Sequence, residues 1–272
     1  MSNKRFGIAV LGENDTLTVT DHIKMIASVG FDAFFTGWDP QKTEECANQA
    51  AKCNLIYQSI HAPFSKVNTL WQEGELGDRY VDDLIECIKD CACYDIPIAV
   101  VHPFIGFHDH TPTQIGIDRF SRLLEVAHCH NVKVAFENVE GEEYLDAIMQ
   151  HFPDDPYVGF CYDSGHELCY NRGRDMLKRY GSRLLHTHLN DNLGVSGESI
   201  TWHDDLHLPP GDGIADWKRI SSTLDEIGYS DILMCELTRT NKPNRHELDV
   251  YQRMSTESFY SYALNALRHI FD

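Results

Sequence analysis

The feature that most constrains this chain is a series of eight short apolar runs, each long enough for one buried strand. Helical patterns separate the runs, as where Phe120, Leu123, Leu124 and Ala127 recur on one helical face. Strands that are apolar on both faces and alternate with helices pair in parallel. The runs are FGIAV from Phe6, DAFFTG from Asp32, LIYQSIHAP from Leu55, IAVVHP from Ile98, KVAFENV from Lys133, VGFCYDSGH from Val158, LLHTHLND from Leu184 and DILMCEL from Asp231.

Eight strand and helix units within 272 residues predict an α/β fold of the (β/α)₈ barrel type. This length suits a single barrel domain over residues 1–272, and no linker rich in Pro, Gly or Ser divides it. A doubly wound open sheet is the alternative, because it uses the same alternation of strands and helices.

The charge balance argues against a polyanionic partner. There are 23 Lys and Arg against 42 Asp and Glu, a formal net charge of −19, and no four basic residues occur in a row. Nucleic acid would be repelled by this field unless a local basic face outweighed it. The sequence therefore predicts no nucleic-acid partner.

Cysteine usage and hydropathy indicate a cytoplasmic protein. The nine cysteines are odd in number, form no CxxC pair and lie mostly in apolar patterns, which is typical of buried free thiols. No apolar run approaches the roughly 18 residues of a membrane span, and no signal-peptide pattern precedes the first strand. We therefore expect no membrane association.

Two connections are longer than the rest, Phe64 to Arg79 after the third run and Asn190 to Gly213 after the seventh. Both follow strands, so a barrel would place both on its carboxyl-terminal rim, where active sites form.

Polar side chains at the ends of the later runs mark the same rim. Taken singly, each has a structural explanation, because a His can be satisfied in a core and a carboxylate can cap the next helix. A barrel would bring all of them to one pocket. Imidazoles mixed with carboxylates suit Zn²⁺, Mn²⁺, Co²⁺ or Fe²⁺. The nine residues are His61, His102, Glu137, Asp163, His166, His188, Asp205, His207 and Glu236.

Ordered motifs around these residues resemble the xylose isomerase-like TIM-barrel superfamily, which holds sugar isomerases and epimerases as well as endonuclease IV. The motifs cover about two thirds of the chain, from the third run to the eighth. They are HAPF at 61–64, VVHP at 100–103, FEN at 136–138, DSGH at 163–166, HLND at 188–191, DLHLPPGDG at 205–213 and CEL at 235–237.

The resemblance implies a divalent metal ion held by Glu137, Asp163, His188 and Glu236, with the two glutamates as the acid/base pair. A metal ion on a sugar's carbonyl and hydroxyl would acidify the adjacent C–H and stabilise the enediolate that forms. Proton return to the other carbon gives isomerisation, and return to the other face gives epimerisation. The metal stays open among Zn²⁺, Mn²⁺, Co²⁺ and Mg²⁺, and the substrate among a free sugar, a sugar phosphate and an inositol derivative.

Two other functions stay open. All nine residues also match the trinuclear zinc set of endonuclease IV, in which His61, His102, His166, Asp205 and His207 would be further ligands. This reading predicts a phosphodiesterase for abasic DNA, against which the net charge of −19 argues. The third function is a barrel that binds a metal or sugar without turnover.

In the isomerase hypothesis, the substrate is contacted by His61, His102, His166 and His207.

Two aromatic segments have two explanations each. Trp71, in the long connection after HAPF, either covers an apolar face of the sugar or packs onto the rim. The carboxyl-terminal helix with Tyr260, Tyr262 and Leu264 either closes the barrel or forms the interface of a homo-oligomer.

Overall fold

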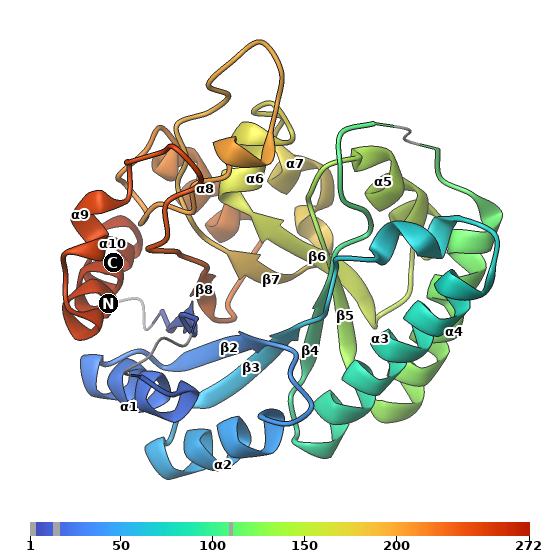
Figure 1. Ribbon diagram of the computed structural model, residues 1–272, viewed down its shortest axis with the longest axis horizontal. Coiled ribbons are helices and arrows are strands. Elements are labelled where there is room, and N and C mark those ends of the chain that lie inside the picture. Colours follow the sequence, from blue (N-terminus) through green and yellow to red (C-terminus); the bar gives the residue numbers. More distant parts are fainter. Residues whose placement is uncertain (1–3, 13–16, 109–110) are drawn as a thin grey trace.

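The computed structural model describes residues 4–12, 17–108 and 111–272 and forms a single eight-stranded parallel sheet. All eight expected strands are present, and Figure 1 shows them in the centre with the helices outside. They are β1 (Phe6–Ala9), β2 (Ala33–Gly37), β3 (Ile56–His61), β4 (Ile98–Val101), β5 (Lys133–Glu137), β6 (Val158–Asp163), β7 (Leu184–His188) and β8 (Leu233–Cys235).

The sheet closes on itself, which confirms the barrel and excludes the open doubly wound alternative. β1 pairs in parallel with both β2 and β8. Between β7 and β8, Leu189 bridges Cys235, and the Thr187 hydroxyl contacts the backbone N–H and C=O of Met234 at 2.8 and 3.1 Å. A side chain thus supplies hydrogen bonds at the seam where the regular ladder is shortest.

The helices begin and end at residues suited to those positions. Thr18 caps α1 in a capping box with Asp21, and Thr113 caps α4. Gly30 ends α1 with φ of 101°. The helices are α1 (Val19–Val29), α2 (Thr43–Cys53), α3 (Glu75–Cys93), α4 (Gln114–His130), α5 (Glu142–His151), α6 (Ser164–Cys169), α7 (Met176–Tyr180), α8 (Trp217–Glu226), α9 (Asp249–Gln252) and α10 (Thr256–Phe271), with 3₁₀ turns η1 (Val67–Trp71), η2 (Gly181–Arg183) and η3 (Trp202–Asp204).

The carboxyl-terminal helix α10 completes the outer ring of helices. It packs against α1 and α8, and the Tyr260 hydroxyl contacts His22 Nδ1 at 2.8 Å and accepts a hydrogen bond from Leu11 N at 3.2 Å. α10 therefore covers the barrel beside α1 and α8, and a homo-oligomer interface at this helix stays a prediction.

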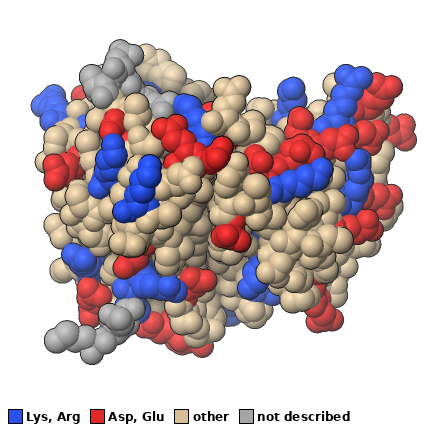
Figure 2. Space-filling view, turned by 90° about the horizontal axis from the view of Figure 1, so that it is seen from below, with Lys and Arg blue, Asp and Glu red and all other residues tan. Residues whose placement is uncertain are grey.

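The remaining surface and core features bear on function. All nine cysteines are free and six are buried. None of the helices in the described ranges combines the length and the apolar character needed to cross a membrane. On the face shown in Figure 2, Lys and Arg side chains lie scattered among carboxylates.

Candidate metal centre

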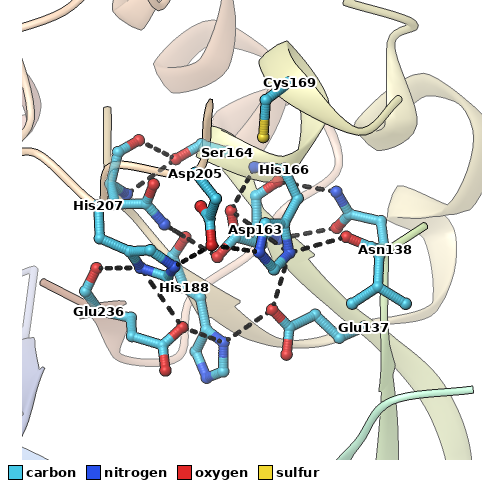
Figure 3. Close-up of polar contacts among 12 residues, drawn as sticks. Glu137, Asn138, Asp163, Ser164, His166, Cys169, His188, Asp205, His207 and Glu236 are labelled. Atoms are coloured by element: carbon cyan, nitrogen blue, oxygen red, sulfur yellow. Dashed lines mark hydrogen bonds and ion pairs between the residues drawn. The ribbon is translucent and has the colours of Figure 1, made fainter. Parts of the chain in front are cut away.

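The nine polar residues expected at the strand ends do meet at the carboxyl-terminal rim. His61, Glu137, Asp163 and His188 are the last residues of β3, β5, β6 and β7. Since the strands are parallel, their ends converge, and Figure 3 shows Glu137, His188 and Glu236 in a row. Residues from six strand ends and the connection after β7 thus form one cluster.

Glu137 lies at the centre of the cluster and is fully buried. Its Oε2 lies 3.2 Å from His102 Nε2 and 3.4 Å from His61 Nε2. Its Oε1 lies 3.2 Å from His166 Nδ1 and 3.3 Å from His188 Nδ1. One carboxylate is therefore shared by four imidazoles from four strand ends.

Glu236 lies on the other side of His188. His188 Nδ1 is 3.2 Å from Glu236 Oε2 and 3.3 Å from Glu137 Oε1, so a single ring nitrogen separates the two carboxylates (Figure 3). The Glu236 side chain is 24% exposed, whereas that of Glu137 is 0% exposed. Glu236 therefore faces the opening of the pocket and Glu137 its floor.

Asp163, His166, Asp205 and His207 form the neighbouring part of the cluster. Asp163 Oδ1 accepts a hydrogen bond from His166 N at 2.6 Å, so the carboxylate also caps α6. Asp205 Oδ2 lies 2.9 Å from His207 Nε2 and 3.5 Å from His166 Nε2. The structural role of Asp163 as a cap and its place in the cluster are thus compatible.

Opposite charges shift the pKa values of both glutamates downward. Burial alone would raise the pKa of Glu137, but His188 and His102 hold it well below its usual range. Burial likewise acts to raise the pKa of Glu236, and His188 and His207 lower it to about 2. Both carboxylates are therefore ionised at neutral pH.

Two adjacent groups, Asp163 and His207, have pKa values that are shifted upward. Burial raises the pKa of Asp163 to about 6, against the opposing effect of His166 and His207. For His207, burial lowers the pKa, but Asp205 outweighs it and raises the value to about 9. The cluster is thus a set of closely spaced charges removed from water.

Two buried ring nitrogens of the cluster, His188 Nε2 and His102 Nδ1, have no hydrogen-bond partner among the described residues. Both carboxylate oxygens of Glu137 and His188 Nδ1 also lack a hydrogen bond and have only the ion-pair contacts given above. Orphaned buried polar atoms are costly unless a ligand satisfies them. Mixed imidazole and carboxylate donors are those that a divalent cation such as Zn²⁺ or Mn²⁺ prefers. The residues present therefore fit a divalent metal ion.

The donor atoms fall into groups compact enough to share an ion, each with all its ligand atoms within 4.8 Å of one another. One group is the four residues expected from the sequence, Glu137, Asp163, His188 and Glu236. Each of the other four groups shares at least one member with it, and one of them includes the buried thiol of Cys161. They are His61, His188 and Glu236; His61, His102 and Glu137; Glu137, Cys161 and His188; and Asp163, His166 and His207.

Trp71 does not belong to this cluster. Its side chain is 3% exposed, its Nε1 donates to Pro103 O at 2.7 Å, and its ring packs on Tyr144 and Phe120. The expectation that Trp71 covers a substrate is therefore replaced by the alternative that it packs onto the rim. Its apolar character suited both positions, and η1 turns the indole inward.

Two residues that the sequence did not single out support the ligands. Asn138 pairs its side-chain amide with the backbone of Asp163, donating to the C=O and accepting from the N–H, both at 2.8 Å. The Phe64 ring stacks on His102 at 4.5 Å between centroids. Both lie inside the quoted motifs, FEN and HAPF, so adjacency to a ligand was the available signal.

Together, the closed parallel barrel and the ligand groups at its rim define a TIM-barrel protein with a metal-capable centre. The chain belongs to the family described as xylose isomerase-like TIM barrel, whose model matches residues 23–254.

The curated proteins that this chain is similar to differ in their names and activities. It is 35% identical over 135 residues to the uncharacterized protein y4fM of Sinorhizobium fredii, covering 47% of this chain and 40% of the relative. It is 25% identical to a probable endonuclease 4 of Mycoplasma mycoides (56% of this chain, 57% of the relative). An inosose dehydratase of Yersinia enterocolitica is 26% identical (46% and 48%). The chain thus spans about half the length of these relatives.

Solved structures agree on the fold. An IolI protein with a bound zinc atom superposes with a TM-score of 0.77 at 17% identity, covering 98% of this chain and 97% of that one. An L-ribulose 3-epimerase gives a TM-score of 0.74 at 15% identity, covering 98% and 94%. At such identities the likeness shows the fold alone.

Proposed function

We propose that this protein is a divalent-metal-dependent isomerase or epimerase of a sugar or related polyol, working by proton transfer through an enediolate. The observation that carries the proposal is the pair of carboxylates, Glu137 and Glu236, on opposite sides of His188 Nδ1 at 3.3 and 3.2 Å. Proton removal and return at carbon need a base and an acid placed around one reacting centre. An inosose dehydratase is among the relatives of this chain, and an L-ribulose 3-epimerase shares its fold.

Glu137, Asp163, His188 and Glu236 would hold the metal ion. When bound, such an ion polarises a carbonyl oxygen and stabilises the negative charge that develops on it. Glu236, at the open side, would take the proton from carbon, and it or Glu137 would return it. The N–H groups of His61, His102, His166 and His207 would orient substrate hydroxyls.

Hydrogen exchange at carbon tests the proposal. Metal-loaded protein is incubated with free sugars, sugar phosphates and inositol derivatives in D₂O, and deuterium uptake is followed by NMR. We expect uptake that falls about 10²–10⁴-fold in Glu137→Gln and in Glu236→Gln, the usual contribution of a general acid or base. Glu86→Gln, at an exposed residue of α3, is the matched control and should exchange normally.

Exchange that survives both glutamine substitutions would overturn the acid/base assignment. Sugar binding without exchange for any substrate class would favour a barrel that binds without turnover.

A phosphodiesterase of the endonuclease IV type is the second candidate. Two ligand groups with no member in common favour it, since they provide donors for more than one ion: His61, His102 and Glu137, and Asp163, His166 and His207. The net charge of −19 argues against duplex DNA as substrate. Nicking of abasic duplex DNA at physiological salt would reverse the order of the two candidates.

A further inference from the structure

A large cavity lies on the rim beside the metal centre and includes none of its nine residues. Its volume is about 810 Å³, and its walls are the segments that follow β4, β5, β6 and β7. Three aromatic side chains line it, Phe107, Tyr170 and Trp202. Ligand pockets of about 300–1,000 Å³ enclose molecules larger than one sugar ring.

The cavity adjoins the centre through two of these aromatic residues. The Tyr170 ring lies 4.7 Å from the His166 ring, measured between centroids, and 5.7 Å from that of Phe107. Trp202 also lines a second cavity, whose walls include His207 and Glu236. A ligand at the metal centre can therefore extend into the rim cavity across a short aromatic border.

The chemistry of the walls fits an uncharged carbohydrate. Aromatic rings pack against the apolar C–H face of a pyranose, and carboxylates and hydroxyls accept and donate hydrogen bonds at its edge. Ser199 adds a hydroxyl to the same wall. Neither an apolar tail nor a bare ion would use both kinds of group.

A phosphate group does not fit the same walls. Four carboxylates and two guanidinium groups line the cavity, and Arg174 pairs with Glu142, which also pairs with Arg179. Three carboxylates therefore stand against the single guanidinium group of Arg172. The excess negative charge would repel an anionic substituent. The carboxylates are Glu140, Glu142, Glu143 and Glu198, and the guanidinium groups are Arg172 and Arg174.

We propose that the rim cavity binds the second, uncharged ring of a glycoside or disaccharide whose first ring lies at the metal centre. The proposal rests on the proposed function and narrows its substrate class from sugars in general to neutral glycosides. Trp202 provides the stacking face, because it is 50% exposed and lies between the two cavities.

Titration calorimetry on the metal-loaded protein tests the subsite. The probes are glucose, glucose 6-phosphate, phenyl glucosides, and α- and β-linked glucosyl and galactosyl disaccharides. At least one neutral glycoside should bind about tenfold or more tighter than glucose, the effect of one well-packed ring. The subsite is overturned if no glycoside exceeds glucose, or if the phosphate ester binds tightest.

Two variants assign the effect to the cavity. Trp202→Ala should weaken glycoside binding about tenfold and leave glucose binding unchanged, whereas Leu76→Ala, at a 69% exposed residue of α3, should change neither. Equal glycoside affinity in Trp202→Ala and the unmodified protein would refute the placement.

The D₂O exchange assay separates this proposal from the proposed function. Glycoside binding that depends on Trp202, without exchange at carbon, supports the subsite and contradicts the isomerase. Exchange on free sugars, with no glycoside preference, supports the isomerase and contradicts the subsite.

Discussion

The two long connections on the rim, after β3 and after β7, are built in opposite ways. The segment after β3 turns inward, with Trp71 in the core and Arg119 beneath it. The Arg119 guanidinium donates to the carbonyls of Thr69, Leu70, Gln72 and Gly74 at 2.5–3.0 Å. The middle of the first connection, Val67–Trp71, is thus packed into the hydrophobic core.

The segment after β7 is held by carboxylates and carries two residues of the metal-capable cluster. Asp191 accepts hydrogen bonds from Gly211 N, Ala215 N and Trp217 Nε1 at 2.8–3.0 Å, so both ends of the segment are fixed. Between them lie Asp205 and His207 of the centre and the exposed Trp202. The length of a connection therefore indicates only that it lies on the rim. The way in which it is anchored decides whether it packs as a wall of the barrel or contributes residues to the centre.

The largest expected difference is between the two tryptophans. Trp71→Ala should lower the free energy of unfolding by about 3–5 kcal/mol, because it removes a packed core ring. Trp202→Ala should change it by no more than about 0.5 kcal/mol. Denaturant titration measures the free energy of unfolding of both variants. Similar losses in the two would contradict the contrast between the two connections.

Replacing Arg119, whose guanidinium group lies beneath the first connection, should have the next largest effect on the free energy of unfolding. Arg119→Met leaves buried carbonyls without donors and should cost about 1–3 kcal/mol of unfolding free energy. Metal content per folded molecule, measured by mass spectrometry, should not change. Arg122→Met, which breaks an exposed pair with Asp82, is the control and should cost about 0–1 kcal/mol. If Arg119→Met loses metal, the connection after β3 also supports the metal centre, and the contrast between the two connections is wrong.

Weakening the anchor of the second connection should affect both stability and metal content. Asp191→Asn puts an amide N–H₂ where Oδ2 accepts from Gly211 and Trp217, which should cost roughly 1–2 kcal/mol. Because the segment carries Asp205 and His207, this variant should also retain less metal after dialysis than Arg119→Met. Equal retention would show that the anchor does not position the ligands.

The smallest effect is expected from Asp204 at low pH. Burial acts to raise the pKa of Asp204, but hydrogen bonds from Ser196 and Thr201 hold it below its usual range. The stabilisation that ionised Asp204 provides is present above the unfolded pKa of about 3.9, and it is lost as the pH falls through the lower folded pKa. Trp202 fluorescence should report the loosening below about pH 4. If Asp204→Asn shows a fluorescence transition of the same size, the transition does not come from Asp204.

Short-range patterns were sufficient to locate the elements but not their ends. The run from Asp231 was expected to extend to Leu237, whereas β8 covers only Leu233–Cys235, because Glu236 turns toward His188. In β7, alternation puts both His186 and His188 inside the barrel. His186 contacts Ser59 Oγ at 3.2 Å one layer below, and only His188 at the strand end reaches the centre.

What the sequence by itself determined is the order of eight strands and helices and the residue types at each strand end. These follow from periodicity and from local chemistry, which act over a few residues. Only the tertiary structure decided that Trp71 is core and Trp202 is rim, and that Glu137 is shared by four imidazoles. Burial and convergence depend on contacts between residues far apart in the chain, and no local pattern encodes those distances.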